Sequence, residues 1–172
     1  GTETLIVIHS NPNAFAALLP NGNVKTWGNS IYGGNSGSIN FNNVTSIKTT
    51  PFNMLALNSS GNLEQWGDEN FSESFSIVNT FPSLSNVSTI FSNKYAYMAI
   101  KSDNSVNVWG VKEYGGDNYI YFSGSRSGSA IDLSNISTVA FNQYSFMAIK
   151  SDGSLVGWGR QENGANVQND LY

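Results

Sequence analysis

The stretch "YSFMAIKSDGSLVGWG", residues 144–159, contains an apolar run, a polar turn and a closing Trp-Gly pair. Two clear copies lie upstream, "YAYMAIKSDNSVNVWG" at 95–110 and "FNMLALNSSGNLEQWG" at 52–67, and a weaker copy, "NAFAALLPNGNVKTWG", occupies 13–28. Counted back from each Trp without a gap, Ala recurs ten residues earlier, Leu or Ile nine residues earlier, and Val or Leu three residues earlier. The chain therefore contains four repeats in register, which indicates one supersecondary unit used four times.

Each repeat is predicted to contain three β-strands, because short aromatic and β-branched runs favour strands and no apolar period of 3.6 residues persists. The first strands are expected at 5–9, 44–48, 87–91 and 136–140, and the third strands end at the tryptophans. The second and third strands are joined by the pairs Asn21-Gly22, Ser60-Gly61, Asp103-Asn104 and Asp152-Gly153. These pairs favour a type I′ hairpin turn, which needs positive φ at both central residues. Asp103 and Asp152 are expected to bond the backbone of their own turns.

The segments between repeats supply candidates for a fourth strand. Short apolar patches precede the next first strand at 39–41, 83–84 and 131–133, and the segment 166–172 would serve the first repeat. Antiparallel four-stranded units of this length are typical of propeller blades. We therefore predict an all-β fold of four antiparallel, four-stranded, propeller-type blades in a single domain over 1–172. The repeat units run approximately over 1–35, 36–78, 79–127 and 128–172.

A second glycine extends the repeat beyond its Trp-Gly pair. It stands five residues after the first glycine, at Gly33, Gly115 and Gly164, while the second repeat has Ser72. The whole pattern resembles the regulator-of-chromosome-condensation repeat, here as a bacterial member or a fragment. The resemblance implies a propeller, usually with seven blades, in which each Trp packs near the contact between blades. The structural residues of the repeat are then Trp27, Gly28, Trp66, Gly67, Trp109, Gly110, Trp158 and Gly159.

Four repeats depart from seven blades. Further repeats in a parent protein, a small closed ring or a homodimer would each complete the assembly. The nucleotide-exchange role of the founding member is not carried over, because its surface residues have no match in this sequence. We expect the tryptophans to be core residues and not sugar-stacking platforms, since they occupy a fixed place at the end of a core strand.

Composition excludes several classes of partner. Charged residues make up only 12% of the chain and the net charge is −4 without a basic run, which argues against binding to nucleic acid. No apolar stretch approaches the roughly 18 residues of a membrane span, so no membrane insertion is expected. The absence of cysteine rules out disulfides and thiolate metal sites. A surface rich in Asn, Ser and Thr favours an extracellular or cell-surface location.

Catalytic and metal-binding chemistry is not expected either. His9 is the only histidine, and its place in the repeat is taken elsewhere by Lys48, Phe91 and Ala140, so it belongs to the scaffold. A lone histidine excludes a His-based metal cluster and a Ser-His-Asp triad. The acidic residues in the variable segments are expected to be solvated loop charges: Asp68, Glu69, Glu73, Glu113, Asp117 and Glu162. We therefore predict no enzyme, no cofactor and no metal.

Three of the five Asn-x-Ser/Thr sequons, those beginning at Asn43, Asn86 and Asn135, occupy the same repeat position just before the first strand. A feature that recurs in register is more simply a requirement of a backbone turn than a glycosylation site.

The longest segment without a counterpart in the other repeats is 117–129, "DNYIYFSGSRSGS". It places Tyr119, Tyr121 and Phe122 near Arg126 in a Ser/Gly-rich setting, the composition of binding hot spots. The alternative is an extra-long blade strand whose apolar side is buried. We predict a non-enzymatic recognition module of a larger secreted or cell-surface protein, such as an adhesin or toxin, that binds another protein. The alternative function is a carbohydrate-binding propeller, with Tyr32, Phe71 and Tyr114 as candidate stacking rings.

Overall fold

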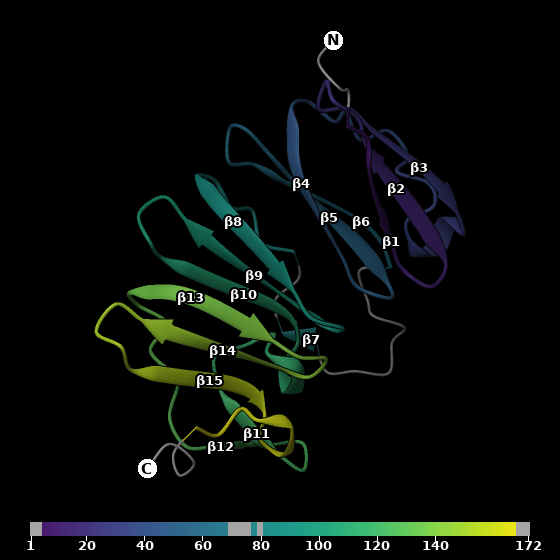
Figure 1. Ribbon diagram of the computed structural model, residues 1–172. Coiled ribbons are helices and arrows are strands. Elements are labelled where there is room, and N and C mark those ends of the chain that lie inside the picture. Colours follow the sequence, from purple (N-terminus) through teal and green to yellow (C-terminus); the bar gives the residue numbers. More distant parts are fainter. Residues whose placement is uncertain (1–4, 69–76, 79–80, 168–172) are drawn as a thin grey trace.

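The computed structural model describes residues 5–68, 77–78 and 81–167. Within them the chain forms four successive sheets arranged as an open arc, with the first and last sheets at its two ends (Figure 1). The sheets confirm the predicted all-β architecture of propeller-type blades. No helix among the described residues is long and apolar enough to cross a membrane.

We number the sheets as blades 1 to 4. Blade 1 contains β1 (Val7–Ser10), β2 (Ala14–Leu18) and β3 (Val24–Gly28), and blade 2 contains β4 (Val44–Thr49), β5 (Asn53–Asn58) and β6 (Leu63–Gly67). Blade 3 contains β7 (Ile77–Val78), β8 (Val87–Ser92), β9 (Ala96–Lys101) and β10 (Val106–Val111). Blade 4 contains β11 (Ile120–Phe122), β12 (Ser125–Ser127), β13 (Ile136–Phe141), β14 (Ser145–Lys150) and β15 (Leu155–Arg160). Short 3₁₀ turns follow three of the Trp strands: η1 (Ser30–Tyr32), η2 (Lys112–Tyr114) and η3 (Gln161–Asn163).

The repeated hairpin differs from the predicted type I′ turn. Between β2 and β3, the Gly22 N–H donates to the Leu19 carbonyl and the Leu19 N–H donates to the Asn23 carbonyl, so the loop has three residues. Only its last residue has positive φ, as at the equivalent positions Gly61, Asn104 and Gly153. This is the three-residue hairpin loop that ends in a left-handed residue. The prediction was wrong because the residue before each of these positions keeps a negative φ.

Other expectations about turns are confirmed. Asp103 and Asp152 accept hydrogen bonds from the N–H groups two residues later, at 3.0 and 2.9 Å. Asn43, Asn86 and Asn135 all have left-handed backbones, with φ of 51°, 58° and 57°. Asn tolerates this conformation better than most residues, which accounts for its recurrence at this position.

The fourth strands do not lie where the apolar patches predicted them. Segments 39–41, 83–84 and 131–133 are not strands. The added strands are β7, which pairs antiparallel with β10, and β11, which pairs parallel with β15. Their hydrogen bonds join the blade that follows, whereas the predicted unit boundaries after 78 and 127 group them with the preceding repeat. Of the segment 166–172, residues 168–172 lie outside the described residues.

The apolar patches cover the contacts between blades instead. Phe41 packs edge-on against Trp66, with ring centroids 5.1 Å apart, and Leu84 packs on the cluster between blades 2 and 3. Ile131 and Leu133 pack on the cluster formed between blades 3 and 4. An apolar patch that covers a gap between sheets has the same composition as a buried strand, and this explains the error.

The core consists of three clusters, each between two neighbouring blades. We call the face of a blade toward the preceding blade its leading flank, and the face toward the following blade its trailing flank. Between blades 2 and 3, the trailing flank supplies Leu55, Leu57 and Leu63, and the leading flank supplies Tyr97, Ala99 and Trp109. The same repeat positions meet at the other two interfaces.

The tryptophans sit on the leading flanks. Trp66, Trp109 and Trp158 are 4%, 1% and 0% exposed, as predicted for core residues. Trp27 is 44% exposed, which contradicts that prediction. The reason is geometric, because blade 1 is at the end of the arc and no described blade covers its leading flank (Figure 1).

Hydrogen bonds connect the same interfaces. The Trp66 indole donates to the Gly33 carbonyl, and the Trp109 indole donates to Gln65 Oε1, both at 3.0 Å. The buried Tyr97 hydroxyl donates to Asn53 Oδ1 at 2.7 Å, from blade 3 to blade 2. Buried polar groups are costly unless they are paired, so these bonds also fix the register of one blade on the next.

The hairpin turns between the second and third strands of each repeat provide a test with a matched control. Gly61 and Gly153 have φ of 78° and 85°, but a Cβ at Gly61 would lie 2.9 Å from Asn86 Cα, whereas nothing lies within 4 Å at Gly153. Gly153→Ala should therefore cost only the left-handed strain of roughly 1–2 kcal/mol. Gly61→Ala should cost about 1–3 kcal/mol more through overpacking. Urea unfolding measures both, and equal losses would contradict this packing of the blades.

The buried phenol of Tyr97 predicts a loss of stability at high pH. Burial raises the pKa of Tyr97 above its usual value of 10, so the folded state disfavours ionisation. This contribution is fully present below pH 10 and is lost as the pH rises further, by up to about 1.4 kcal/mol per pH unit. The free energy of unfolding, measured with urea, should fall less between pH 8 and pH 11 in Tyr97→Phe than in the wild type. An equal fall in the variant and the wild type would show that Tyr97 does not cause the loss of stability at high pH.

Candidate functional site

The insertion that the sequence singled out forms a hairpin at the edge of blade 4. β11 and β12 pair through Phe122 and Ser125, and β12 is the last strand of the five-stranded sheet. The two turn residues, Ser123 and Gly124, both have positive φ, 47° and 78°. This is the signature of a type I′ turn, which matches the twist of the flanking strands. The hairpin is therefore tight and geometrically defined.

Three of the four predicted ligand-binding residues form one network, in which Asp117 binds two of them and Arg126 contacts the third. The Tyr121 hydroxyl donates to Asp117 Oδ2 at 2.7 Å, and Arg126 donates to the same oxygen at 2.7 Å and to the Tyr121 hydroxyl at 2.9 Å. The Arg126 guanidinium also lies over the Tyr119 ring, 4.1 Å from its centroid. Asp117 is only 6% exposed, which contradicts its expected role as a solvated loop charge. Arg126 and Tyr121 supply the ionic and hydrogen-bonding partners of its Oδ2 atom.

The electrostatics of this network favour one fixed protonation state. Burial, the largest cause, raises the pKa of Tyr121 to about 12. Hydrogen bonds to Tyr121 and then to Asp117 raise the pKa of Arg126. Tyr121 therefore stays neutral and Arg126 stays charged near neutral pH. The network can brace the hairpin, but neither group is suited to proton transfer at neutral pH.

The braced hairpin leaves two groups available at the surface. Phe122 is 55% exposed, and the Arg126 side chain is 47% exposed despite its ion pair. A hollow of about 270 Å³ lies beside them and is lined by Lys112, Glu113, Tyr121, Gly124 and Arg126. The alternative interpretation of this segment as a blade strand also holds in part, since β11 pairs with β15 and Tyr121 is buried.

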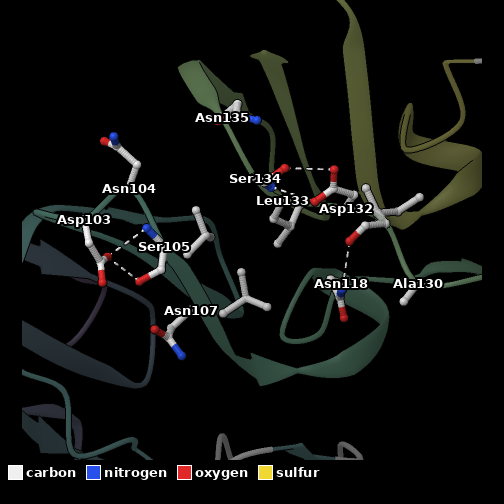
Figure 2. Close-up of a pocket in the computed structure, with 13 residues that line it drawn as sticks. Asp103, Asn104, Ser105, Asn107, Asn118, Ala130, Asp132, Leu133, Ser134 and Asn135 are labelled. Carbon is white, nitrogen blue, oxygen red and sulfur yellow. Dashed lines mark hydrogen bonds between the residues drawn. The ribbon is translucent and has the colours of Figure 1, made fainter. Parts of the chain in front are cut away.

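A larger cavity of about 830 Å³ lies between blades 3 and 4 (Figure 2). One wall is the turn at 103–108, and the other is the segment 130–135, which leads into β13. In blades 1 and 2 the equivalent turn is hydrogen-bonded to the next blade. The Val44 N–H donates to the Gly22 carbonyl, and the Val87 N–H donates to the Gly61 carbonyl. The described residues show no such bond from Asn104 to blade 4.

A steric reason for this cavity follows from the glycines. A Cβ at Gly22 would lie 2.5 Å from Asn43 Cα, so a side chain at this repeat position requires the two blades to separate. Asn104 has such a side chain. The cavity lining contains polar and aliphatic side chains but no aromatic ring. Its carboxylates are engaged, Asp103 with Ser105 and Asp132 with Lys150. It therefore lacks a platform for stacking against a sugar ring.

Sequence analysis missed a row of aromatic rings on the turns after β4, β8 and β13. Phe52, Tyr95 and Tyr144 stand fourteen residues before their tryptophans, and each is partly exposed. Tyr95 stacks on Tyr114 at 4.5 Å and on Tyr144 at 6.0 Å, and it lies 5.8 Å from Phe52. Counting the register further back from each Trp would have revealed this row.

Cations flank the aromatic row. Lys94 lies 5.3 Å from the centroid of the Tyr95 ring, and Arg160 lies 5.2 Å from that of Tyr114. Of the rings proposed for sugar stacking, Tyr114 is buried, Tyr32 is partly exposed, and Phe71 lies outside the described residues.

His9 lies partly buried in β1, where burial and then the nearby charge of Lys48 lower its pKa. The described part of the chain contains no group of three His, Asp or Glu residues that could hold a metal ion.

A mutant series tests whether Arg126 braces the hairpin. Arg126→Ala leaves a buried carboxylate at Asp117 without its cation, and an unpaired buried charge is more costly than the absence of both partners. The double variant Asp117→Ala/Arg126→Ala should therefore be more stable than Arg126→Ala alone. Urea unfolding together with hydrogen exchange at β11 and β12 measures this order. If the single variant proves at least as stable as the double variant, Asp117 is not held by Arg126.

Comparison with known proteins rests on structure alone. No protein-family model matches the sequence, and no curated protein is recognisably similar to it. Prp20p from Saccharomyces cerevisiae, described as yeast RCC1, matches with a TM-score of 0.62 and 20% identity over 95% of this chain and 46% of that chain. The CRINKLY WD40 ectodomain of the receptor kinase ACR4 from Arabidopsis thaliana matches with a TM-score of 0.60 and 19% identity, over 96% of this chain and 54% of the other.

Human WBSCR16 is a third similar structure, with a TM-score of 0.58, 17% identity and coverage of 91% of this chain and 48% of that chain. The chain thus spans about half the length of these three solved structures. Its four sheets have the fold of regulator-of-chromosome-condensation-type propeller blades, as the Trp-Gly repeat indicated.

Proposed function

We propose that the chain is a non-enzymatic protein-binding module of a larger secreted or cell-surface protein, such as an adhesin or a toxin. The observation that carries the proposal is the Phe122 ring, which is 55% exposed on a hairpin braced from within. Exposed aromatic and arginine side chains on rigid elements are the usual anchors of protein interfaces.

The bracing matters for affinity because ordering a loop on binding opposes association. In this hairpin the type I′ turn and the contacts of Arg126 with Asp117, Tyr121 and Tyr119 already restrict the conformation. A partner would then bury Phe122 and cover the exposed part of Arg126 with little loss of conformational freedom. The preferred partner offers an apolar pocket for Phe122 and a carbonyl or carboxylate for Arg126.

The similar structures support this class of function. Prp20p is described as binding Gsp1p and histones, and the ACR4 match is an ectodomain of a receptor kinase. A protein-binding role and an extracellular location are therefore both found on this fold. For this chain, the proposal rests on the hairpin.

A second candidate function is carbohydrate binding, which the aromatic row favours. Tyr95 and Tyr144 are partly exposed, and each stands two residues after an asparagine, Asn93 or Asn142. The Oδ1 atom of each asparagine accepts a hydrogen bond from the backbone N–H of the tyrosine. Repeated tyrosines beside asparagines are suited to sugar recognition. The tyrosine faces are turned toward one another in stacks, however, which leaves less ring surface for a ligand.

The test compares capture of surface proteins by immobilised wild-type chain and by Phe122→Ser, with quantitative mass spectrometry. Full burial of a Phe side chain is worth about 1.5–3 kcal/mol, so specific partners should bind the variant at least about tenfold more weakly. Ile31→Ser is the control, because Ile31 is an exposed apolar residue outside the hairpin. Equal capture by wild type and Phe122→Ser would contradict the hairpin as the binding site. Binding to a glycan array that is lost in Tyr144→Ala would favour the second candidate.

A further inference from the structure

The leading flank of blade 1 is an interface surface without a partner in the described chain. Trp27, Phe15 and Ile8 are 44%, 43% and 61% exposed. The residues at the same positions of blade 3, Trp109, Tyr97 and Ile90, are almost fully buried against blade 2. The exposed flank of blade 1 therefore has the composition of a blade contact and not of a solvent-facing surface.

This flank already has the geometry of a formed contact. Phe15 and Trp27 stack with centroids 5.5 Å apart and an interplanar angle of 14°. The corresponding pair on blade 4, Phe146 and Trp158, stacks at 5.3 Å and 14° while buried against blade 3. Blade 1 therefore presents a preorganised aromatic pair.

The trailing flank of blade 4 presents the complementary half. Met147, Ile149 and Leu155 stand where blade 2 has Leu55, Leu57 and Leu63, which receive the leading flank of blade 3. Ile149 is 41% exposed. This flank has the aliphatic pattern of a trailing flank, and no described blade packs on it.

A hollow on the same flank corresponds to the seat of a tryptophan. In blade 1, Ala14 and Ala16 belong to the cluster that contains Trp66, and the Trp66 indole N–H donates to the Gly33 carbonyl. In blade 4 these positions are Ser145, Met147 and Gly164, and together with Phe141 and Asn142 they line a hollow of about 230 Å³. A Cβ at Gly164 would contact nothing within 4 Å, whereas one at Gly115 would lie 2.6 Å from Phe146.

We propose that the occupant of each flank is a second copy of this chain, docked head to tail. Trp27 of each copy inserts beside Gly164 of the other, and Phe15 packs on Met147, Ile149 and Leu155. Such contacts continue the three established blade interfaces in register. Each copy carries both halves, and a heterologous contact of this kind closes a ring when the rotation permits.

Two copies suffice because each is an arc of four blades (Figure 1). The chain covers 44–54% of the lengths of the solved propellers RCC1 and ACR4, so one copy corresponds to about half of such a structure. Pairing of two leading flanks would instead place two aromatic pairs against each other with no hollow to receive them. The head-to-tail ring is independent of the hairpin proposed above as the binding site.

Light scattering coupled to size exclusion tests the proposal through the mass of the purified chain. The wild type should have twice the chain mass of 18.6 kDa. Trp27→Asp and Met147→Asp should each give the single-chain mass, because each removes one half of the same contact. Both positions are at least partly exposed in the single chain, so the variants should remain folded. The circular dichroism of each variant checks this.

Ile31→Glu is the matched control. Ile31 is an exposed apolar residue of blade 1 in η1, away from the leading flank, and its counterparts in blades 3 and 4 are Glu113 and Glu162. This variant should remain a dimer. A monomeric wild type would overturn the proposal, as would a Met147→Asp variant that still dimerises. Masses above two copies would show an open polymer and overturn the closed ring.

A spectroscopic readout follows the same contact. Trp66, Trp109 and Trp158 are buried within the chain, so Trp27 is the only tryptophan whose exposure should change on association. Dilution below the dissociation constant should shift the fluorescence emission to longer wavelength in the wild type. Trp27→Phe should abolish this shift, and a shift that persists in Trp27→Phe would exclude the Trp27 contact as its origin.

Discussion

The contact between the leading flank of one blade and the trailing flank of the blade before it is the interaction on which this structure depends. A single repeat unit cannot bury its apolar face alone, and here each apolar cluster lies between two sheets. One aromatic ring removes roughly 150–250 Å² from water. At about 25 cal/mol per Å² this is worth up to roughly 4–6 kcal/mol, before the entropy of ordering is subtracted. Blades therefore stabilise one another as neighbours, as in other repeat proteins.

Polar groups make this stacking specific, and blade 2 uses different polar residues from the other blades. Asn11, Asn93 and Asn142, sixteen residues before their tryptophans, each donate to a carbonyl at the end of the following 3₁₀ turn. Blade 2 has Thr50 at this position, and there Asn53 donates to the Asp68 carbonyl, two residues after Trp66. The Asn53 Oδ1 atom accepts hydrogen bonds from Thr50 and from Tyr97 of blade 3. The buried polar groups of this blade are therefore paired, and one of their hydrogen bonds joins blade 2 to blade 3.

The sequence was sufficient for the parts of the fold that repeat. The register of Trp, Ala and Leu identified the blades and most of the core, because each position has the same neighbours in every copy. It was insufficient for side-chain contacts that occur in one blade only. Asp117 and Arg126 are nine residues apart on a loop of unknown shape, so their ion pair could not be separated from two solvated charges. The patch at 39–41 had the composition of a strand, yet it lies over Trp66 in place of a strand.

Assembly and recognition occupy different edges of blade 4, so one does not obstruct the other. In the sheet order β12-β11-β15-β14-β13, the hairpin stands at one edge and β13 at the other. The flank that receives Trp27 is the face of β14 and β15, which the hairpin leaves uncovered. A head-to-tail ring would therefore carry two hairpins, each presenting Phe122, on opposite halves of one body. Two sites fixed in one ring can bind a repetitive surface with an avidity well above that of either site alone, which suits a module that recognises another surface.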